Sequence, residues 1–591
     1  MENEKSTNSL KKQKMTTVGV VALIFSFVAA GAFGIEEAIS ASGPGVTLLM
    51  LLLFPFIWSF PLCEMVGELG SIFPNEGGVY AWGRAAFGEF WGWQVGWWSG
   101  ITTWIQQAQY CVLVAGYTSK IFELTPTTEY AVKIGMVVIF TIINIIGLDV
   151  LEKLETIFNI LVLIAFGAVT IVGFMNWNYN PIEPFYNPGE GVFSSFGSGV
   201  AIIIWMYSGY ECMSNMAEEM ENPQIIPKAM RISQPIIALS YILPTLAALA
   251  AIGQWSAWST EQTAGYVGYA DVLIQYVGNW AGTLFVIVAI ISNMGIFCSY
   301  IAHGSRAFFV MADDHMFPLL MRKVDKRGIP TISIILLGIF TVICCQFDFT
   351  TLVMASTPIQ LYLYLFLVAT LYKLRKMYPI EERKKMGLAI MPGGSRFLAL
   401  LSGMVIVICM FAIYANGTDY FVTGFLALAL GLAMYIAFKW IYKGNFKTDP
   451  INYPINPSTK LGFGDLADIG IYILLTGVMA LGGTAFLYLY EGSWGAEYYL
   501  EEYATGIFSS FYGMLKLCIL IGVICVVIGF ALYKYGKKTE GNIVKGLEAS
   551  RKLVIDEELR ELIGAAPGID NVDDFLVKKA IVEDDAALTQ V

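Results

Sequence analysis

Long, uninterrupted apolar runs dominate the pattern of hydrophobic and polar positions along this chain. Examples are residues 18–33, 46–57, 157–174, 236–252, 283–301, 332–345 and 515–533. A helix that crosses a membrane needs about 20 mainly apolar residues, and these runs lack the polar face that a helix at the surface of a soluble protein presents. The pattern therefore predicts an all-α polytopic membrane protein with about fourteen transmembrane helices.

Glycine-rich stretches interrupt two of the predicted spans, the first and the sixth. Residues 29–35 read AAGAFGI and residues 205–210 read WMYSGY. Glycine lowers the cost of leaving helical geometry, and unpaired backbone at membrane depth is tolerated only where it lines protein or a cavity. Both stretches open a set of five spans, which predicts a five-plus-five inverted repeat with discontinuous helices 1 and 6. The alternative is that Gly31, Gly34 and Gly209 only allow close helix packing.

Carboxylates follow both predicted breaks. A charged side chain inside the bilayer costs about 2.5–3.5 kcal/mol on insertion scales and commonly marks a substrate or ion path. Glu211 directly follows the second break, and we interpret it as functional. Glu36 and Glu37 follow the first break and either belong to the site or lie in water at an outer mouth. Glu64 and Glu68 lie either on the path or near the inner face.

Composition agrees with a membrane protein and narrows the chemistry. Hydrophobic residues make up 56% of the 591 residues and charged residues 14%, against roughly 25% charged in soluble domains. The nine cysteines are scattered without a C-x-x-C pair, so we expect no disulfide framework, no metal site and no cofactor. The only histidines are His303 and His315, and H-E-x-x-H, G-x-S-x-G and Walker-type motifs are missing, so we expect neither an enzyme with catalytic residues nor an ATP-driven pump.

The distribution of Lys and Arg predicts the orientation. If the N-terminus is cytoplasmic, the loops on the cytoplasmic side carry most of the Lys and Arg. The outer segments 176–191, 256–268 and 491–506 then carry none. Both termini are therefore expected in the cytoplasm. The predicted divisions are a cytoplasmic N-terminus (1–15), the inverted-repeat transport core of helices 1–10 (16–375), helices 11 and 12 (376–440), a cytoplasmic linker (441–464), two extra helices, 13 and 14 (465–535), and a cytoplasmic acidic tail (536–591) with a possible short helix at 554–563.

Three stretches carry a family resemblance. Residues 68–82 read ELGSIFPNEGGVYAW, residues 218–227 read EEMENPQIIP, and residues 305–318 read SRAFFVMADDHMFP. They resemble the signatures E-L-x-x-x-x-P-x-x-G-G-x-Y, E-x-x-N-P-x-x-x-x-P and S-R…A-R-D-G…P of the amino acid–polyamine–organocation superfamily of secondary transporters. The resemblance extends over roughly residues 15–440 and implies a LeuT-type core, whose broken helices bind substrate and which works by alternating access.

The first break departs from the family pattern. The family motif G-S-G-I-F, whose amides receive a substrate carboxylate, corresponds to residues 29–33, AAGAF. Residues 34–37, GIEE, are similar to the G-V-E-D of eukaryotic polyamine uptake transporters, as are residues 54–59 and 87–92. These features favour a cationic amine, whereas Ser208-Gly209 keeps the glycine of the amino-acid branch.

Candidate residues follow from the breaks and the resemblance. Where some relatives carry a coupling lysine in the fifth helix, this chain has Val162, with Asn159 one turn earlier, which favours exchange or a glutamate-based proton path. The candidate substrate-binding residues are Ala30, Gly31, Ala32, Phe33, Glu36, Trp205, Tyr207, Ser208, Gly209 and Glu211, and the coupling candidates are Glu37, Asn159 and Glu211.

The predicted function is secondary active transport of amino acids or polyamine-like cations across the plasma membrane, coupled to protons or to exchange with a counter-substrate. A diamine would suit two carboxylates, whereas a neutral amino acid would leave one glutamate free to carry a proton. The alternative is a passive channel or nutrient-sensing receptor on the same scaffold. The expected partners are the substrate, a proton or counter-substrate and the lipid bilayer; homo-oligomerisation stays open, and no nucleic acid is expected.

Overall fold

The structure is a computed structural model. It describes residues 16–29, 31–73, 77–122, 124–146, 151–219, 225–260, 265–314, 316–385, 390–391, 393–415, 418–441, 454–489 and 509–564. Almost all of these residues are helical, and within these ranges β-structure is limited to two isolated bridges, Trp258 with Val267 and Ile455 with Gly462.

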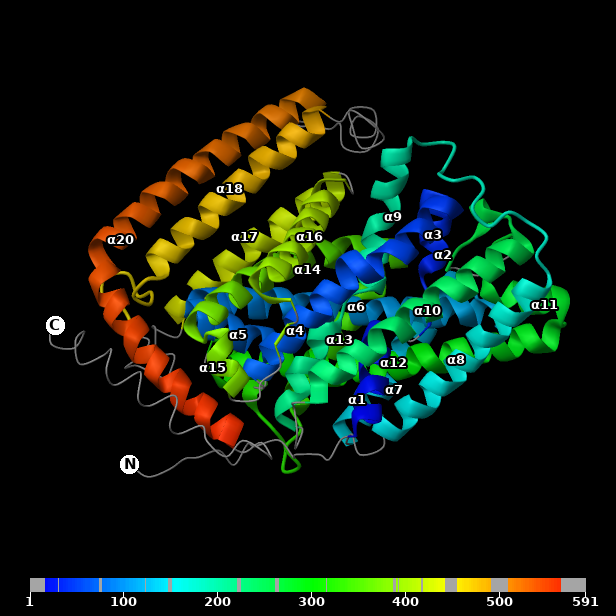
Figure 1. The fold of residues 1–591 in the computed structure, drawn as a ribbon, viewed down its shortest axis with the longest axis horizontal. Coiled ribbons are helices and arrows are strands. Elements are labelled where there is room, and N and C mark those ends of the chain that lie inside the picture. Colours follow the sequence, from blue (N-terminus) through cyan, green and yellow to red (C-terminus); the bar gives the residue numbers. More distant parts are fainter. Residues whose placement is uncertain are drawn as a thin grey trace.

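The first five predicted spans correspond to the helices before residue 176 (Figure 1). In chain order the elements are α1 (Thr17–Val28), α2 (Ile35–Ser42), α3 (Pro44–Phe54), the π-helical turn η1 (Pro55–Ser59), α4 (Phe60–Ile72), α5 (Gly78–Phe87), α6 (Glu89–Phe122), α7 (Pro126–Ile146) and α8 (Leu151–Met175).

The next five predicted spans lie between residues 192 and 377. Their elements are α9 (Val192–Met206), the 3-10 helix η2 (Tyr210–Glu219), α10 (Ile226–Ile252), η4 (Trp255–Ala257), α11 (Tyr269–Tyr276), α12 (Asn279–Asp313), η5 (Leu319–Arg322), α13 (Thr331–Cys344) and α14 (Phe349–Met377).

The remaining helices follow this core along the chain. They are α15 (Ile380–Lys385), α16 (Gly394–Ala415), α17 (Thr418–Ile441), α18 (Asp465–Leu489) and α20 (Phe511–Gly564). Within the described residues, eleven helices are long and apolar enough to cross a membrane, and α1 and α13 are shorter apolar helices. The prediction of an all-α polytopic protein is therefore confirmed, while the number of about fourteen transmembrane helices stays a prediction.

Both predicted breaks are present in the backbone. Helix α1 begins where the Thr16 side chain accepts a hydrogen bond from the Gly19 N–H, at 3.1 Å, and it ends at Val28. Gly31 and Gly34 then take φ angles of +114° and +97°, a region that residues with a Cβ rarely adopt, and the chain starts again as α2. In the sixth span α9 ends at Met206 and continues as η2. The first and sixth helices are therefore discontinuous, each at the start of a five-span set, as expected for the LeuT-type core.

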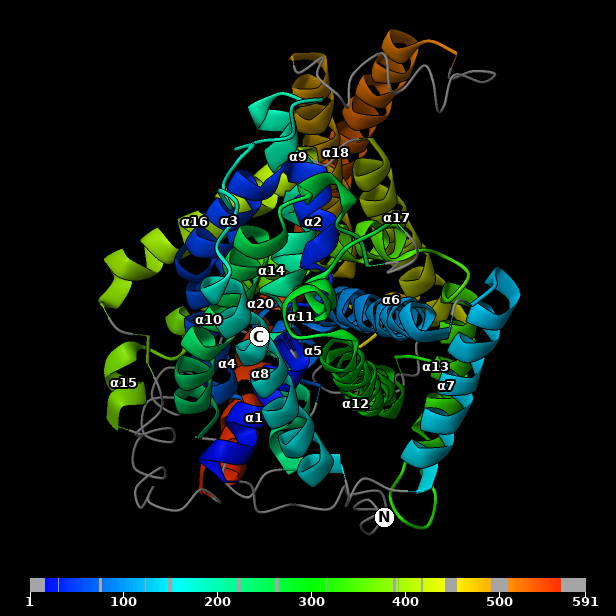
Figure 2. The ribbon, with the colours of Figure 1, turned by 90° about the vertical axis from the view of Figure 1, so that its right-hand side faces the viewer.

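Helices α18 and α20 pack side by side along one edge of the molecule (Figures 1 and 2). Their backbones approach closely, because a Cβ on Gly477 would lie 2.7 Å from the Gly522 carbonyl oxygen. Helix α20 runs from Phe511 to Gly564 without interruption. It therefore crosses the predicted end of helix 14 at residue 535, and the short helix expected at 554–563 is its last part.

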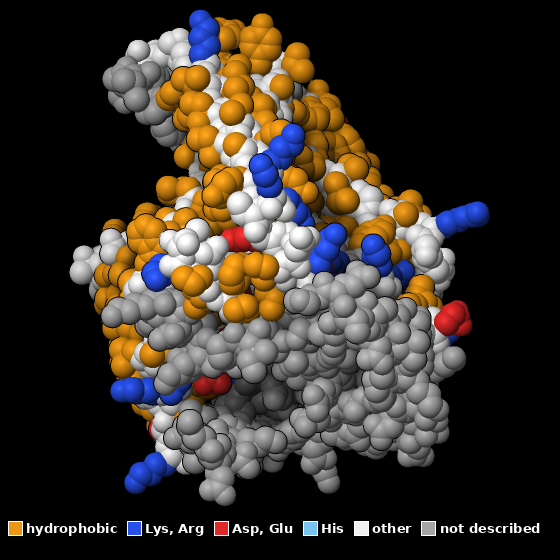
Figure 3. Space-filling model, turned by 90° about the vertical axis from the view of Figure 1, so that its left-hand side faces the viewer, with side chains coloured by type: hydrophobic (Ala, Val, Ile, Leu, Met, Phe, Trp, Pro, Cys, Tyr) orange, Lys and Arg blue, Asp and Glu red, His pale blue; other side chains and the backbone are white. Residues whose placement is uncertain are grey.

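The exposed side chains of α20 change character along the helix. In Figure 3, apolar side chains cover most of the upper part of this face below a basic side chain at its top end, and further Lys and Arg side chains lie beneath the apolar region. The apolar part includes Leu520, Val527 and Phe530, which are 56%, 61% and 48% exposed, and Lys534 and Lys537 follow as exposed residues. An apolar band that ends in a basic one is what a helix leaving the hydrocarbon region presents.

Candidate functional site

The two helix breaks lie against each other in the interior. The Tyr241 hydroxyl of α10 lies 3.0 Å from the Val28 carbonyl oxygen and 2.9 Å from the Met206 carbonyl oxygen, and its proton is shared between them. Val28 is the last residue of α1 and Met206 is the last residue of α9. Because the carbonyl end of a helix carries partial negative charge, two such ends converge at one tyrosine.

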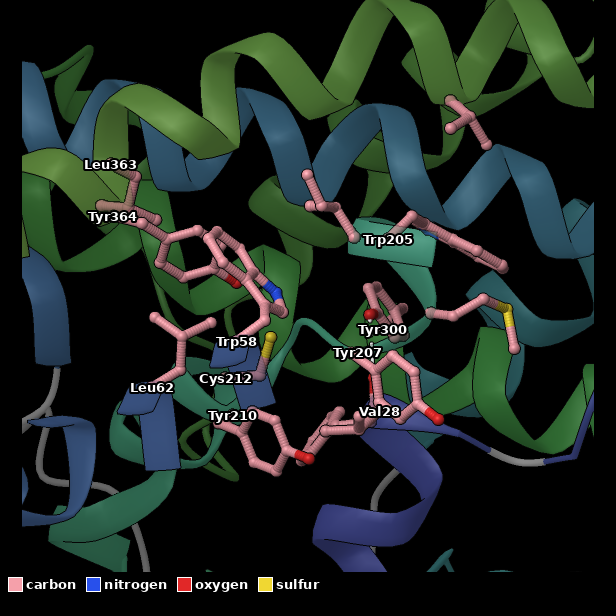
Figure 4. Close-up of a cluster of buried hydrophobic side chains, with 14 of the residues drawn as sticks. Val28, Trp58, Leu62, Trp205, Tyr207, Tyr210, Cys212, Tyr300, Leu363 and Tyr364 are labelled. Carbon is pink, nitrogen blue, oxygen red and sulfur yellow. Dashed lines mark hydrogen bonds between the residues drawn. The ribbon is translucent and has the colours of Figure 1, made fainter. Parts of the chain in front are cut away.

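A second contact also joins the two breaks. Gly209 has a φ of +106°, and a Cβ there would lie 2.9 Å from the Phe27 carbonyl oxygen. The same oxygen accepts a hydrogen bond from the Tyr300 hydroxyl of α12, at 3.1 Å. Figure 4 shows how Val28, Tyr207 and Tyr300 gather here from segments far apart in the sequence. Glycine at position 209 therefore permits the close approach of the two breaks.

Aromatic side chains enclose the first break. A Cβ on Gly31 would lie 2.5 Å from the Phe166 ring and 2.7 Å from the Phe33 ring. The Phe33 ring in turn packs against the rings of Tyr117 and Phe166, with centroids 5.3 Å and 5.0 Å away. Ala32 is fully buried beside them. Glycine at position 31 thus permits the positive φ angle and also leaves room for the neighbouring rings. Ala30, the remaining candidate in this stretch, lies outside the described residues.

The Glu36 side chain is completely buried. Its carboxylate accepts a hydrogen bond from the Gly34 N–H, at 2.9 Å, and another from the Tyr117 hydroxyl of α6, at 2.7 Å. The position of Glu36 in the first turn of α2 places its negative charge at the positive end of that helix. The alternative that Glu36 lies in water at an outer mouth is therefore wrong.

Glu211 is the buried carboxylate of the second break, with 6% exposure. It accepts hydrogen bonds from the Tyr364 hydroxyl at 2.9 Å and from the Gln360 amide at 3.2 Å, both on α14. The Gln360 carbonyl oxygen accepts from the Gln106 amide of α6, at 3.0 Å. Tyr364 also accepts a long hydrogen bond, 3.3 Å, from the Gly209 N–H. A polar chain thus runs from the second break across α14 to α6.

Charge pairing separates these two glutamates from Glu64 and Glu68. Within the described part of the chain, no Lys or Arg nitrogen lies within 4.0 Å of the Glu36 or Glu211 carboxylate. Glu64 and Glu68 are also buried, but both form ion pairs, with Arg231 at 2.7 Å and with Arg375 and Arg383 at 2.5 Å each. Glu64 and Glu68 therefore join α4 to neighbouring helices. Of these four glutamates, only Glu36 and Glu211 have no cationic partner among the described residues.

Trp205 lies beside the first break, although it belongs to the sixth span. Its ring packs edge-on against Phe349 with centroids 5.2 Å apart, and a Cβ on Gly34 would lie 3.1 Å from it. The side chain is 8% exposed. The fold thus brings Trp205 to the start of α2, where Glu36 lies.

Tyr207 and Ser208 are held by neighbouring helices. The Tyr207 hydroxyl donates to the Leu51 carbonyl of α3, at 2.9 Å, so its polar end is directed toward α3. The Ser208 hydroxyl donates to the Ile204 carbonyl at 2.6 Å and accepts a long hydrogen bond, 3.4 Å, from the Trp58 indole N–H. Both side chains secure the end of α9.

The other coupling candidates anchor the half-helices. One Glu37 carboxylate oxygen accepts from the Ser259 hydroxyl at 2.9 Å and from the Thr260 N–H and hydroxyl at 2.8 and 2.7 Å. Asn159 of α8 donates to the Ala22 carbonyl at 2.8 Å and shares hydrogen bonds with the Ser26 hydroxyl. Glu37 thus fastens α2 to the segment after α10, and Asn159 fastens α1 to α8.

Several residues that contact the breaks were not predicted from the sequence. They are the tyrosines and the glutamine that supply hydrogen bonds to the breaks: Tyr117, Tyr241, Tyr300, Gln360 and Tyr364. The available signal was a polar group within an apolar span, which is uncommon and often functional. In the described part of the chain, no group of three or more His, Cys, Asp or Glu side chains could hold a metal ion.

This chain is similar to several known proteins and matches the model of one protein family. A probable polyamine transporter from Arabidopsis thaliana is 27% identical over 360 residues, which cover 60% of this chain and 70% of the relative. The Arabidopsis polyamine transporter RMV1 is 25% identical over 382 residues, 64% of this chain and 76% of the relative. The crystal structure of MhsT in complex with L-phenylalanine is matched with a TM-score of 0.49 and 12% identity, over 70% of this chain and 100% of that one. The model of the amino acid permease family matches residues 15–438. Since this match covers well over half of the sequence, the chain belongs to the amino acid permease family.

Proposed function

We propose that this protein is a secondary active transporter that carries small organic cations with protonated amines, of the polyamine kind, across the plasma membrane. The observation that carries the proposal is the pair of buried carboxylates, Glu36 and Glu211, one at each helix break and neither paired with a cation among the described residues. A buried charge without a partner is costly. A protonated amine would supply the missing charge.

The N-terminus of α2 favours a cation over a substrate carboxylate. In an inverted-repeat transporter, the N–H groups at such a half-helix attract an anionic substrate group. Here the Gly34 N–H already donates to the Glu36 carboxylate, at 2.9 Å. A second carboxylate would meet the negative charge of Glu36, whereas an ammonium group would be attracted to it. The polyamine transporters among the relatives support the same substrate class.

Carbonyl groups and aromatic rings near the breaks add to the case for a cation. The carbonyl ends of α1 and α9 converge at Tyr241, and helix carbonyl ends attract positive charge. The ring of Trp205 lies close to Gly34, where it could stack over a methylene chain or an ammonium group. We assign Glu36, Glu211 and Trp205 to substrate binding.

A neutral or cationic amino acid is the second candidate substrate. The family description and the glycine at position 209 favour it. In that case one glutamate would be free to carry the coupling proton. We assign this role to Glu211, because the Tyr364 hydroxyl can donate to its carboxylate or accept a hydrogen bond from its protonated acid.

The two discontinuous helices support transport by alternating access. Short half-helices such as α2 can tilt when the bonds at their ends change. Glu37 and Asn159 each hold one half-helix of the first span, α2 and α1 respectively. We assign residues 16–375 to this transport core. The predicted orientation, with both termini cytoplasmic, completes the proposal.

Uptake into proteoliposomes tests the proposal. Labelled putrescine, arginine and alanine are offered to the wild type and to Glu36→Gln and Glu211→Gln at several pH values. Glutamine keeps the shape of the side chain and one oxygen acceptor but removes the charge. We expect each variant to lower putrescine uptake by more than about tenfold, equal to about 1.4 kcal/mol. Glu381→Gln is the control, since the Glu381 side chain is 80% exposed.

The uptake results distinguish the candidate substrates, and they distinguish a transporter from a channel or receptor. Good transport of alanine with no transport of putrescine or arginine would replace the cation by a neutral amino acid. Saturable counterflow of labelled substrate would exclude a passive channel or a receptor. Unchanged uptake of every substrate in both variants would show that neither carboxylate contacts the cargo.

A further inference from the structure

A pocket outside the candidate site lies at the end of α10, next to the start of α3. Its cavity volume is about 240 Å³, and its lining includes Pro44, Tyr179, Glu183, Gln254 and Trp255. A water molecule takes up about 30 Å³ in the liquid, so the pocket holds a ligand of several heavy atoms. None of the candidate substrate-binding residues lines it.

The walls of this α10 pocket are fixed by backbone contacts. The N–H groups of Asn178 and Tyr179 both donate to the Ala250 carbonyl of α10, at 2.8 and 2.9 Å. Gly253 caps α10 with a φ of +66°, and a Cβ there would lie 3.0 Å from the Tyr179 ring. Glycine at position 253 therefore leaves room for the ring against the helix end, in a backbone conformation that residues with a Cβ rarely adopt.

The chemistry of the lining suits a cation. Glu183 brings a carboxylate, and Tyr179 and Trp255 bring aromatic rings, whose faces attract ammonium groups. The pocket also lies at the carbonyl end of α10, where the helix dipole is negative. The two segments that contribute these residues, 176–191 and 253–260, contain no Lys or Arg. Pro44 belongs to the N-terminal end of α3, where the helix dipole is positive, so the full negative charge of Glu183 and the two aromatic rings are what favour a cation here.

We propose that the α10 pocket binds a small organic cation, such as a diamine, independently of the site between the helix breaks. A bound ligand would touch Pro44, the first residue of α3, which follows Gly43 at the end of α2. The same junction is held by the loop that carries Glu183, because the Val46 N–H donates to the Phe185 carbonyl at 2.6 Å. Occupancy of the pocket would therefore stabilise one position of α2, the half-helix that bears Glu36.

Equilibrium binding of labelled putrescine to the full-length protein in nanodiscs tests this second site. The Glu36→Gln/Glu211→Gln double variant removes the carboxylates of the proposed transport site. We expect this variant to keep one saturable putrescine site, and we expect Glu183→Gln or Trp255→Ala, added to it, to weaken that site by at least about tenfold. Glu190→Gln is the matched control, since Glu190 lies on the same loop and outside the pocket lining.

These binding measurements test the α10 pocket independently of transport. Loss of all binding in the double variant, or equal weakening by Glu183→Gln and Glu190→Gln, would overturn it. A charge test comes from 1,4-butanediol, which has hydroxyl groups in place of the two ammonium groups of putrescine. Displacement of putrescine by the diol at similar concentrations would also overturn it. Failure of the proposed function would appear in the uptake assay, as uptake that does not depend on Glu36 or Glu211. Putrescine binding at the α10 pocket would be unaffected by that result.

Discussion

Replacing Lys439 with methionine should strongly destabilise the protein. Lys439 lies on α17 and its side chain is completely buried. Its ammonium nitrogen lies 2.8 Å from a Glu89 oxygen of α6 and 3.9 Å from an Asp465 oxygen at the start of α18. One cation thus serves two carboxylates and joins the extra helices to the core. Methionine keeps about the length and the apolar stem of the side chain and removes the charge together with the N–H donors of the ammonium group.

The expected magnitude follows from the burial of the two carboxylates. Glu89 and Asp465 are each 5% exposed. Removing one partner of a buried ion pair typically costs about 3–5 kcal/mol, because a buried charge is left uncompensated. Asp465 keeps hydrogen bonds from the Tyr435 hydroxyl at 2.6 Å and from the Gly462 N–H at 2.8 Å, which offset part of the loss. We therefore expect a loss of about 3 kcal/mol in the free energy of unfolding.

Thermal unfolding of the purified protein in detergent measures this effect. Lys384→Met is the control, because Lys384 and Glu381 form an ion pair with side chains 58% and 80% exposed, and such pairs contribute about 0–1 kcal/mol. Adding Glu89→Gln to Lys439→Met should recover part of the loss, since it removes one of the stranded charges. Equal melting temperatures for Lys439→Met and Lys384→Met would refute the reasoning.

Two further predictions concern helix contacts. Gly477→Ala should lower the melting temperature, because its Cβ would lie 2.7 Å from the Gly522 carbonyl oxygen and would push α18 away from α20. Gly541→Ala, with no atom within 4 Å of its Cβ, should instead gain the roughly 1 kcal/mol by which alanine favours a helix over glycine. A change of melting temperature in the same direction for both variants would contradict the packing of α18 on α20. Tyr241→Phe should cost about 1–3 kcal/mol and slow uptake, because the carbonyl groups that end α1 and α9 lose their donor; wild-type melting and uptake would show that these carbonyl groups do not depend on Tyr241.

The positions of the helix breaks could be predicted from local sequence. Gly31, Gly34 and Gly209 all adopt positive φ angles, and glycine is the residue that tolerates them. The predicted alternative for these glycines, close packing, also applies, since a Cβ on any of them would meet a neighbouring side chain or backbone atom within 3 Å. Backbone freedom and packing are thus two properties of the same residues.

The environment of each glutamate could not be predicted from sequence. Glu64 and Glu68 look like Glu36 and Glu211 in the linear chain, as acidic residues in or beside apolar spans. Only the fold brings Arg231 to Glu64, and Arg375 to Glu68 across more than 300 residues. Whether a buried carboxylate is a structural ion pair or a binding group depends on such long-range partners, which leave no mark in the local pattern.

The sequence by itself determined the membrane class, the helical architecture and the location of the two breaks. These depend on local properties, namely the length of apolar runs, which a bilayer requires, and the conformational freedom of glycine. The tertiary structure alone decided which polar groups meet. Tyr117 reaches Glu36, Tyr364 reaches Glu211 and Tyr241 joins the ends of α1 and α9 because helix packing brings together side chains that are distant in sequence. A buried polar group needs a partner in three dimensions, and the linear pattern does not specify which residue will supply it.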